Sequence, residues 1–313
     1  PFSESIQKKL DFVTIPVVNY YFDILKTAIE KVTEKKISSE KWNGKSAAVF
    51  LSHDVDKLRS GWKEDSYHEL KKGKLLSGSK IIANQSKGLN SWQNLMDIIE
   101  LEKRYKAKST FYFITEKNSF QGIKNADYSI QDKTIFKLIN NIKKEGFNVG
   151  IHGSYGSAFI KEKLLNECEK IDNESNRFHY LSWSQNLTPY ILEDSPIESD
   201  STLGFSEHYG FRNSFCHPFP LFDFKNDRPF NFLEIPLTIM DTTFQQKKYM
   251  DIEKEQIPLI ISELIDEIEQ FNGMISILWH NNFFTNYKYE GWGQIYEEIL
   301  KITQLKNCHY WSP

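Results

Sequence analysis

Hydrophobic positions along the chain follow two periods, one typical of buried strands and the other typical of amphipathic helices. The stretch 47–56, AAVFLSHDVD, starts as an apolar run that predicts a buried strand and ends abruptly in polar residues. Later runs rich in β-branched and aromatic residues predict further strands, and the segments between them carry apolar residues at helical spacing. The predicted strands are 47–56, 109–115, 147–152, 177–183, 233–241 and 274–280, and the predicted helices are 91–106, 130–145, 159–172, 253–271 and 291–306. This alternation predicts an α/β fold with a largely parallel sheet, open or closed into a barrel.

Single residues predict where some of these elements begin, end or bend. Ser91 is a suitable N-cap for the helix that follows it, and Gly146 is a suitable C-cap for the helix before it. Pro236 cannot donate a ladder hydrogen bond, so it predicts an edge or a bulge in the strand that contains it. Residues 57–90 are rich in Lys, Gly and Ser and have weak periodicity, which predicts a solvated, mobile loop after the first strand. The alternative is an insertion that shapes a substrate groove.

The N-terminal region has a helical pattern of its own. Apolar residues recur at helical spacing over residues 4–36, and Pro16 interrupts them. The pattern predicts two helices joined at or near this proline and packed outside the main domain. Residues 38–45 form a polar linker. We therefore expect a helical appendage over residues 1–45 and one main domain over residues 46–313.

Composition and net charge mainly exclude classes of protein and of partner. A chain of 313 residues with 40% hydrophobic residues can bury one large core. The formal net charge of −3 gives no basic footprint, so nucleic acid is not expected as a partner. No apolar run has the length of a membrane span and no signal peptide is visible, although the start at Pro1 leaves room for a removed leader. The odd number of widely spaced cysteines (Cys168, Cys216 and Cys308) predicts reduced thiols, as in a cytoplasm.

Charged and imidazole side chains recur at the ends of the predicted strands. In a parallel barrel the carboxyl ends of all strands face one side, so residues distant in the sequence can meet there. Carboxylate oxygens and imidazole nitrogens are ligands for divalent metals, and a catalytic site leaves one position open for water. A metal, a general base and a separate general acid are what amide or ester hydrolysis requires. The set consists of Asp54, Asp56, His152, Arg177, His179, Asp200, Asp241 and His280.

In chain order, these segments resemble the motifs of the polysaccharide deacetylases, which are carbohydrate esterase family 4 with the NodB-homology fold. The resemblance covers about residues 47–285 and is to the branch whose first motif is His-Asp-Val-Asp. It implies a deformed (β/α) barrel and the metal-assisted removal of N- or O-acyl groups from a sugar. It also implies a divalent cation, with zinc as the first choice and cobalt or manganese as alternatives. The similar segments are 52–56 (SHDVD), 149–155 (VGIHGSY), 176–181 (NRFHYL), 200–205 (DSTLGF) with 210–212 (GFR), and 277–280 (ILWH).

The resemblance implies a role for each central residue. Asp54 corresponds to the base, and Asp56 and His152 correspond to metal ligands. The two aspartates are adjacent in the commonest form of the family and separated by one residue here, so an exchange of their roles is the alternative. Arg177 corresponds to the arginine that orients the base, and His280 corresponds to the general acid.

One metal ligand of the family pattern is missing. The second motif normally carries histidines at positions i and i+4, and here Gly156 follows His152 at i+4. Because glycine has no side chain with which to bind a metal, the third ligand must come from another segment. We expect His179 in this role, with Ser154 or a water molecule as alternatives.

Other residues are candidates for substrate contacts or for support. Arg212, Trp279 and Tyr155 are the candidates for a substrate groove. For Arg212 the alternative is a loop packed over the barrel mouth, and for Trp279 it is the buried core. Asp200 and Asp241 are expected to support the site, and Asp241 either hydrogen-bonds the acid histidine or caps the next loop.

The sequence thus predicts a (β/α)-barrel hydrolase that removes acyl groups, in the first place acetyl, from a carbohydrate. A protein of another class is the first alternative, namely a carbohydrate-binding or scaffolding protein that kept the fold and lost the chemistry. The missing second histidine motivates it. The second alternative is a metal-independent amidohydrolase that acts on a small molecule.

Overall fold

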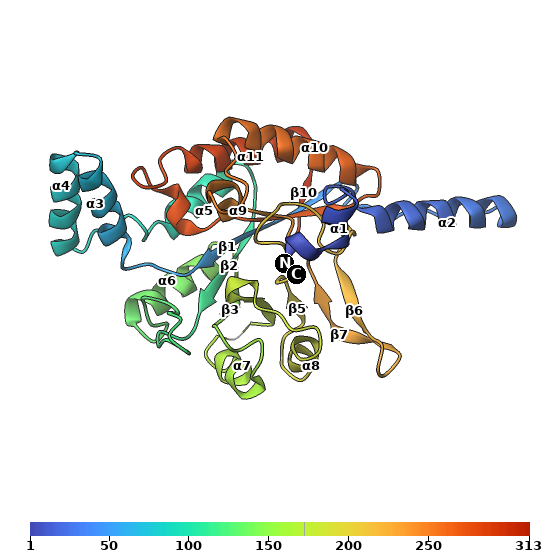
Figure 1. Ribbon diagram of the computed structural model, residues 1–313, viewed down its shortest axis with the longest axis horizontal. Coiled ribbons are helices and arrows are strands. Elements are labelled where there is room, and N and C mark those ends of the chain that lie inside the picture. Colours follow the sequence, from blue (N-terminus) through green and yellow to red (C-terminus); the bar gives the residue numbers. More distant parts are fainter. Residues whose placement is uncertain (172) are drawn as a thin grey trace.

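A ten-stranded, mostly parallel sheet lies at the centre of the computed structural model, which describes residues 1–171 and 173–313 (Figure 1). Its strands are β1 (Ala48–Val55), β2 (Ser109–Ile114), β3 (Asn148–Gly153), β4 (Ser175–Phe178), β5 (Ser199–Asp200), β6 (Phe219–Asp223), β7 (Arg228–Glu234), β8 (Ile239–Met240), β9 (Met274–Leu278) and β10 (His309–Tyr310). The long apolar strand predicted around residue 50 is β1. All eight of its residues are buried, because a parallel strand is covered on both faces.

The strand order places β1 inside the sheet, between β2 and β9. The order is β6-β7-β5-β4-β3-β2-β1-β9-β8, with β10 paired to the start of β1. In the described part of the chain, every pair is parallel except β6 with β7. The sheet curls into a half-barrel, which confirms the predicted α/β fold with a deformed (β/α) barrel. Parallel pairing brings the carboxyl ends of β1, β3, β4, β8 and β9 to the same side of the molecule.

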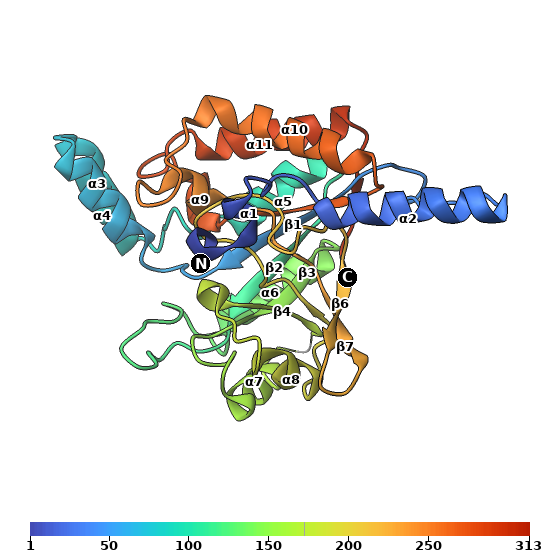
Figure 2. The ribbon, with the colours of Figure 1, turned by 45° about the vertical axis from the view of Figure 1, so that its right-hand side comes forward.

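Amphipathic helices cover the outside of this sheet (Figures 1 and 2). Ile142 packs with Phe111 in one buried cluster, and Ile261 and Ile299 pack with Ile277 in another. Each such side chain contributes roughly 1.5–3 kcal/mol when it leaves water. The helices are α5 (Leu95–Arg104), α6 (Lys133–Lys144), α7 (Lys161–Cys168), α8 (Thr188–Glu193), α9 (Asp241–Gln245), α10 (Ile257–Glu269) and α11 (Trp292–Leu305). The five predicted helices correspond to α5, α6, α7, α10 and α11, with shorter bounds, and the end of α6 before Gly146 is as predicted.

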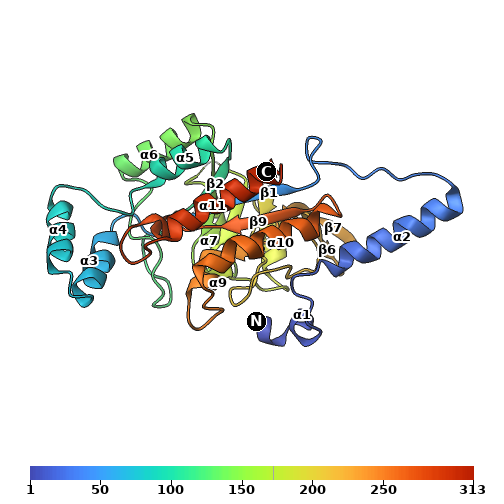
Figure 3. The same ribbon diagram turned by 90° about the horizontal axis from the view of Figure 1, so that it is seen from above.

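Two N-terminal helices follow the predicted pattern around Pro16. Helix α1 (Ile6–Lys9) comes after a short 3-10 turn, η1 (Phe2–Glu4), and α2 (Val17–Thr33) begins directly after the proline. The amide nitrogen of Gln7 donates to the carbonyl oxygen of Arg212 at 2.5 Å, which holds α1 on the barrel. Helix α2 extends away from the barrel (Figure 3). Among the described residues, no helix is long and apolar enough to cross a membrane.

The segment 57–90 differs from the prediction of a mobile loop. It forms two packed helices, α3 (Gly61–Lys71) and α4 (Leu75–Ser86), which project from the barrel as a hairpin (Figure 2). Gly78 allows the close approach of α4, because a Cβ at this position would lie 2.6 Å from Cγ of Leu70. The apolar periodicity is weak because each helix packs mainly on the other and buries few large side chains. The loop prediction was therefore wrong.

Three predicted element boundaries also need correction. Helix α5 begins at Leu95, and the Ser91 hydroxyl does not cap it but donates to Asp65 at 2.5 Å. The stretch 233–241 is divided between β7 and β8, and Pro236 lies between them, where its missing N–H cannot break a ladder. The strand predicted over 177–183 ends at Phe178.

A buried polar network joins β1 to the helices behind it. The ring of His53, fully buried, donates from Nδ1 to the carbonyl oxygen of Trp279, and its Nε2 lies 2.9 Å from Glu102 Oε1. The hydroxyls of Ser109 and Tyr296 donate to the same Glu102 carboxylate. A buried carboxylate is tolerated when several donors satisfy it. The network therefore fixes the strand from which the acidic residues of the site project.

Candidate active site

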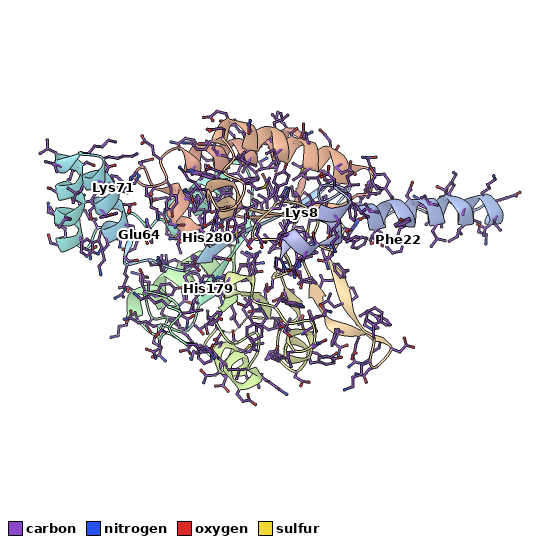
Figure 4. All side chains as sticks on the ribbon, viewed as in Figure 1. Lys8, Phe22, Glu64, Lys71, His179 and His280 are labelled. Atoms are coloured by element: carbon purple, nitrogen blue, oxygen red, sulfur yellow. The ribbon has the colours of Figure 1, made fainter. Side chains whose placement is uncertain are left out.

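A cavity of about 430 Å³ opens at the carboxyl ends of the central strands. Residues from β1, β3, β9 and the turn after β4 line it, and Figure 4 shows His179 and His280 near the centre of the molecule. Side chains alternate along a strand, so Ser52, Asp54 and Asp56 share one side of β1 and its extension. The spacing of the acids in the sequence thus determines that both face this cavity.

Three of the predicted metal ligands lie together. Asp56, His152 and His179 each offer one ligand atom, and these atoms all lie within 4.8 Å of one another. His152 Nε2 is 3.3 Å from Asp56 Oδ1, and His179 Nε2 is 3.8 Å from Asp56 Oδ2. Residues separated by about a hundred positions in the sequence therefore meet, because β1, β3 and β4 run parallel in one curled sheet and their carboxyl ends face the same side.

The donor set of this cluster fits a divalent cation. His152 Nδ1 donates to the carbonyl oxygen of Arg177 at 2.7 Å, which orients Nε2 toward the carboxylate, as metal-bound histidines are usually oriented. Asp56 Oδ1 is buried, and no hydrogen-bond partner is found for it among the described residues. Burial lowers the pKa of His179 to about 4, so this imidazole is neutral at physiological pH. For Asp56, burial would raise the pKa, but His179 and His152 hold it well below its ordinary range.

At Gly156, the position of the missing second histidine, the backbone conformation and the Phe120 ring both disfavour a side chain. Gly156 has φ +99°, and a Cβ at this position would lie 2.7 Å from the ring of Phe120. Any larger residue would therefore be strained. The Ser154 hydroxyl, a predicted alternative ligand, donates to Glu167, and its backbone N–H donates to the same carboxylate at 3.0 Å. Neither position offers a side-chain ligand to the cluster.

A strained turn brings His179 to the cluster in their place. After β4 the chain forms a short 3-10 turn, η2 (His179–Leu181), in which Tyr180 has φ +60° and Leu181 has φ +50°. Two consecutive left-handed residues that are not glycine cost of order 1–3 kcal/mol each, and such strain is typical of functional sites. The Tyr180 ring stacks on the His179 ring, with centroids 4.0 Å apart. The turn thereby fixes the imidazole against the other two ligands.

Asp54 lies beside the cluster and is paired with an arginine. Arg177 donates to Asp54 Oδ1 at 2.9 Å, while Asp54 Oδ2 lies 3.5 Å from His152 Nε2. Burial by itself would raise the pKa of Asp54, but the charges of His152 and Arg177 outweigh it and lower the pKa below its ordinary range. The carboxylate is therefore ionised and can accept a proton.

The arginine itself is held on every side. Its fully buried guanidinium donates to the Ser52 hydroxyl, and to the carbonyl and hydroxyl oxygens of Ser201, each at 2.8 Å. The Tyr112 ring lies below it, with 4.8 Å from the guanidinium carbon to the ring centroid. Ser52, Ser201 and Tyr112 were not singled out from the sequence, because a serine or tyrosine in a strand gives no signal of which distant residue it contacts.

On the other side of the cavity, a second carboxylate holds His280. The ring Nδ1 of His280 donates to Asp241 Oδ1 at 2.8 Å, which leaves Nε2 as the free ring nitrogen. Asp241 is fully buried at the start of α9, and its Oδ1 also accepts from the backbone N–H of Thr242. Burial would lower the pKa of His280, but the adjacent Asp241 carboxylate raises it to about 10. The imidazole is therefore a proton donor at neutral pH.

Comparison with known proteins places this site on a known fold. A structure from Mycobacterium smegmatis that is designated a polysaccharide deacetylase has a TM-score of 0.55 and 13% identity, and the match covers 88% of this chain and 90% of that one. A second structure with this designation, from Pseudomonas aeruginosa PAO1, has a TM-score of 0.54 and 14% identity over 89% of this chain and 92% of that one. This chain has the polysaccharide deacetylase fold. No protein-family model and no curated protein sequence matches it.

Within this deacetylase fold, two predicted substrate residues face away from the cavity. Trp279 is fully buried and packs on Trp292 and Tyr296 in the core, because it points to the opposite side of the chain from His280. Its ring therefore cannot stack on a sugar. The Arg212 guanidinium donates to the carbonyl oxygen of Gly204 at 2.8 Å and does not line the cavity. The alternatives given for these two residues, core packing and a loop packed on the barrel, describe them better.

The remaining predicted residues lie just outside the cavity. The Tyr155 ring packs edge-on against Tyr180, with centroids 6.1 Å apart, and Tyr180 lines the cavity itself. Asp200 accepts from Asn176 at 2.6 Å and lies opposite Glu234 in the sheet. Burial and the charge of Asp200 raise the pKa of Glu234 well above its ordinary range, which favours the protonated form of Glu234.

Several residues that line the cavity were not predicted from the sequence. They lie in α9, in the loop that follows it and in the loop after β5, where the sequence shows no motif and no periodicity. Their side chains provide a cation, hydroxyls, an amide and an aromatic ring around the entrance, as the rim of a polar ligand site requires. They are Ser206, Thr242, Gln246, Lys248 and Tyr249.

Proposed function

We propose that this protein is a metal-dependent hydrolase that removes acyl groups, in the first place acetyl, from a sugar or polysaccharide. The observation that carries the proposal is the Asp56, His152 and His179 cluster, placed between an arginine-paired aspartate and an aspartate-paired histidine. The polysaccharide deacetylase fold supports the same substrate class. The cavity of about 430 Å³ has room for one sugar residue with its acyl group.

Asp56, His152 and His179 are the residues that would hold a divalent cation. When bound, the cation acts as a Lewis acid toward the acyl carbonyl oxygen. Zinc is the first choice, because one carboxylate and two imidazoles are a ligand set that it favours, and cobalt or manganese are alternatives. The burial that keeps His179 neutral favours binding, because a metal does not have to displace a proton from this ring.

The other charged residues divide the proton transfers between them. Asp54 takes a proton from the attacking water as the water oxygen forms a bond to the acyl carbon. Arg177 keeps this carboxylate ionised and holds it in place. His280 gives its Nε2 proton to the nitrogen or oxygen of the sugar as the bond from that atom to the acyl carbon breaks. Asp241 keeps the imidazole charged until this step.

The structure bears on the two alternative functions as well. The missing second histidine was the reason to consider a binding protein without catalytic activity. His179 lies 3.8 Å from Asp56, where it could take the place of that histidine as a ligand, so this reason carries less weight. A metal-independent amidohydrolase needs a general base and a general acid, but it would not need the additional cluster of Asp56, His152 and His179. Asp56 Oδ1, buried and without a hydrogen-bond partner among the described residues, supports the metal-dependent proposal over both.

An assay of acetate release tests the proposal. The purified protein, incubated with N-acetylated and O-acetylated oligosaccharides, is expected to release acetate, to lose this activity on dialysis against a chelator, and to regain it with zinc, cobalt or manganese. Activity that is unaffected by chelation would contradict the metal half of the proposal. Absence of both metal binding and acetate release would support the carbohydrate-binding alternative instead.

The role of His179 gives a more specific prediction. His179→Ala is expected to lower the affinity for zinc by about 10–100-fold, because one of three protein ligands is lost. Affinity is measured by competition with a chromogenic chelator, which needs no substrate. Ser154→Ala and His68→Ala are the controls, since Ser154 donates to Glu167 and His68 lies on the α3–α4 hairpin. Equal zinc affinity in His179→Ala and in the wild-type protein would exclude His179 as a ligand.

A further inference from the structure

The hairpin formed by α3 and α4, residues 61–86, is a feature that the proposed chemistry does not use. It projects from the barrel with its turn, Lys72 to Lys74, at the far end (Figures 1 and 2). Figure 4 shows Lys71 toward the outer part of the hairpin and Glu64 closer to the barrel. We refer to residues 71–76, KKGKLL, as the hairpin tip. All six residues of the tip are exposed.

Acidic side chains of the hairpin are bound near its base or buried inside it. Glu64 accepts from Lys57 at 3.0 Å and from Lys288 at 2.8 Å. Asp65 is fully buried and accepts from Ser91. Glu69 is 4% exposed. Of the three carboxylates of the hairpin, Glu64 is therefore paired with lysines outside the tip, and Asp65 and Glu69 are buried.

The tip, in contrast, carries unbalanced positive charge. No acidic residue occurs between Glu69 and Asp97, the longest such stretch in the chain, although the chain as a whole has a net charge of −3. In the described part of the protein, Lys71 and Lys72 have no ion-pair partner, and Lys74 lies 3.8 Å from the buried Glu69. A cluster of this kind attracts an anionic surface and not a neutral one.

Two leucines in the tip are exposed beside these lysines. Leu75 is 65% exposed and Leu76 is 90% exposed, the latter among the highest values of any large hydrophobic residue in the protein. An anionic polysaccharide would pair with the lysines but would leave both leucines in water. A phospholipid surface satisfies both groups, because the headgroups pair with lysine and the interface takes up leucine.

We propose that the hairpin tip docks on the surface of an anionic phospholipid bilayer, with Leu75 and Leu76 in the interface and Lys71, Lys72 and Lys74 on the headgroups. This is surface association by a short basic and apolar projection. Each lysine near an anionic bilayer strengthens binding by roughly fivefold, and each leucine that enters the interface adds a comparable factor. Binding is therefore reversible, and it weakens as salt screens the lysines.

Flotation of the full chain with lipid vesicles tests this proposal. Vesicles of phosphatidylcholine with about one third phosphatidylglycerol are expected to carry the protein upward at low salt, and vesicles of phosphatidylcholine alone are not. The variant with Lys71→Gln, Lys72→Gln and Lys74→Gln is expected to partition about 100-fold less, and the variant with Leu75→Ser and Leu76→Ser about 25-fold less. Both change exposed residues only, so their thermal unfolding should match that of the wild type.

Matched controls separate the tip from general surface charge and apolarity. The first replaces the exposed lysines Lys133, Lys137 and Lys144 of α6 with glutamine, and the second replaces the exposed leucines Leu259 and Leu305 with serine. Both are expected to bind vesicles like the wild type. Equal losses in the control and tip variants would overturn the proposal, as would the absence of binding to anionic vesicles. Binding to dextran sulfate in place of the vesicles would identify an anionic polysaccharide surface and overturn it as well.

Discussion

Replacement of Asp54 by asparagine is expected to lower the turnover number by about 10²–10⁴-fold, the usual contribution of a general base. The amide has nearly the same shape as the carboxylate, and its oxygen can still accept from Arg177, so the buried arginine keeps a partner. What is lost is the ability to take a proton from water. Acetate release gives the rate, and elemental analysis of the protein gives the metal content, which is expected to stay near that of the wild type.

Asp56→Asn is the informative comparison for this variant, because the two aspartates occupy neighbouring positions on the same side of β1. It is expected to lose metal, since Asp56 lies against both His152 and His179. If Asp54→Asn loses the metal and Asp56→Asn keeps it, the roles of the two residues are exchanged. Near-normal turnover in Asp54→Asn would remove it from the mechanism. Asp132→Asn is a control for the substitution itself, since Asp132 is half-buried, accepts from Arg59 and does not line the cavity.

The second large effect is expected from His280. His280→Ala is expected to lower the turnover number by about 10²–10⁴-fold, because no other group would protonate the leaving atom. Activity requires the protonated imidazole, so the rate of the wild type should fall as the pH rises through the pKa of His280, which is raised to about 10. In His280→Ala this alkaline limb should disappear from the pH profile of the residual activity.

Asp241→Asn tests the cause of the high pKa. Burial lowers the pKa of His280, and the Asp241 carboxylate raises it by more. Without this negative charge the pKa falls, so the alkaline limb is expected to move to lower pH while some activity remains. As a control, His208→Ala should leave the profile unchanged, because His208 is a half-buried histidine whose ring packs on Phe2. An alkaline limb at the same pH in wild type, His280→Ala and Asp241→Asn would exclude His280 as the acid.

Much of the architecture could be predicted because its signals are local. The apolar run before Asp54 is visible in the sequence as a strand, and the spacing of Asp54 and Asp56 places both on one side of it. The N-terminal helices on either side of Pro16 were recognised in the same way. The short strands β5, β6 and β10 were harder to detect, since two to five residues carry little periodicity.

The site could be predicted from the sequence only where a motif or the position of a residue at a strand end indicates its contacts. The pairing of His280 with Asp241 was one of two predicted options, and the structure contains this hydrogen bond together with a bond to the backbone of the next residue. The contacts of Arg177 with Ser201 and Tyr112 could not be predicted, because they depend on how β4 lies between its neighbours. Residue type alone does not indicate such partners.

By itself, the sequence determined the alternation of strands and helices, the order of the motifs and the candidate acids and histidines, since these follow from residue type and spacing. The tertiary structure alone decided three further points. It ended β4 early in a strained turn that carries His179 to the cluster, whereas the expected strand would have continued past it. It directed Trp279 into the core, because neighbouring strands and α11 cover that side of β9. It also folded residues 57–90 into a hairpin, because packing of one helix on another compensates for a periodicity too weak to be recognised in either alone.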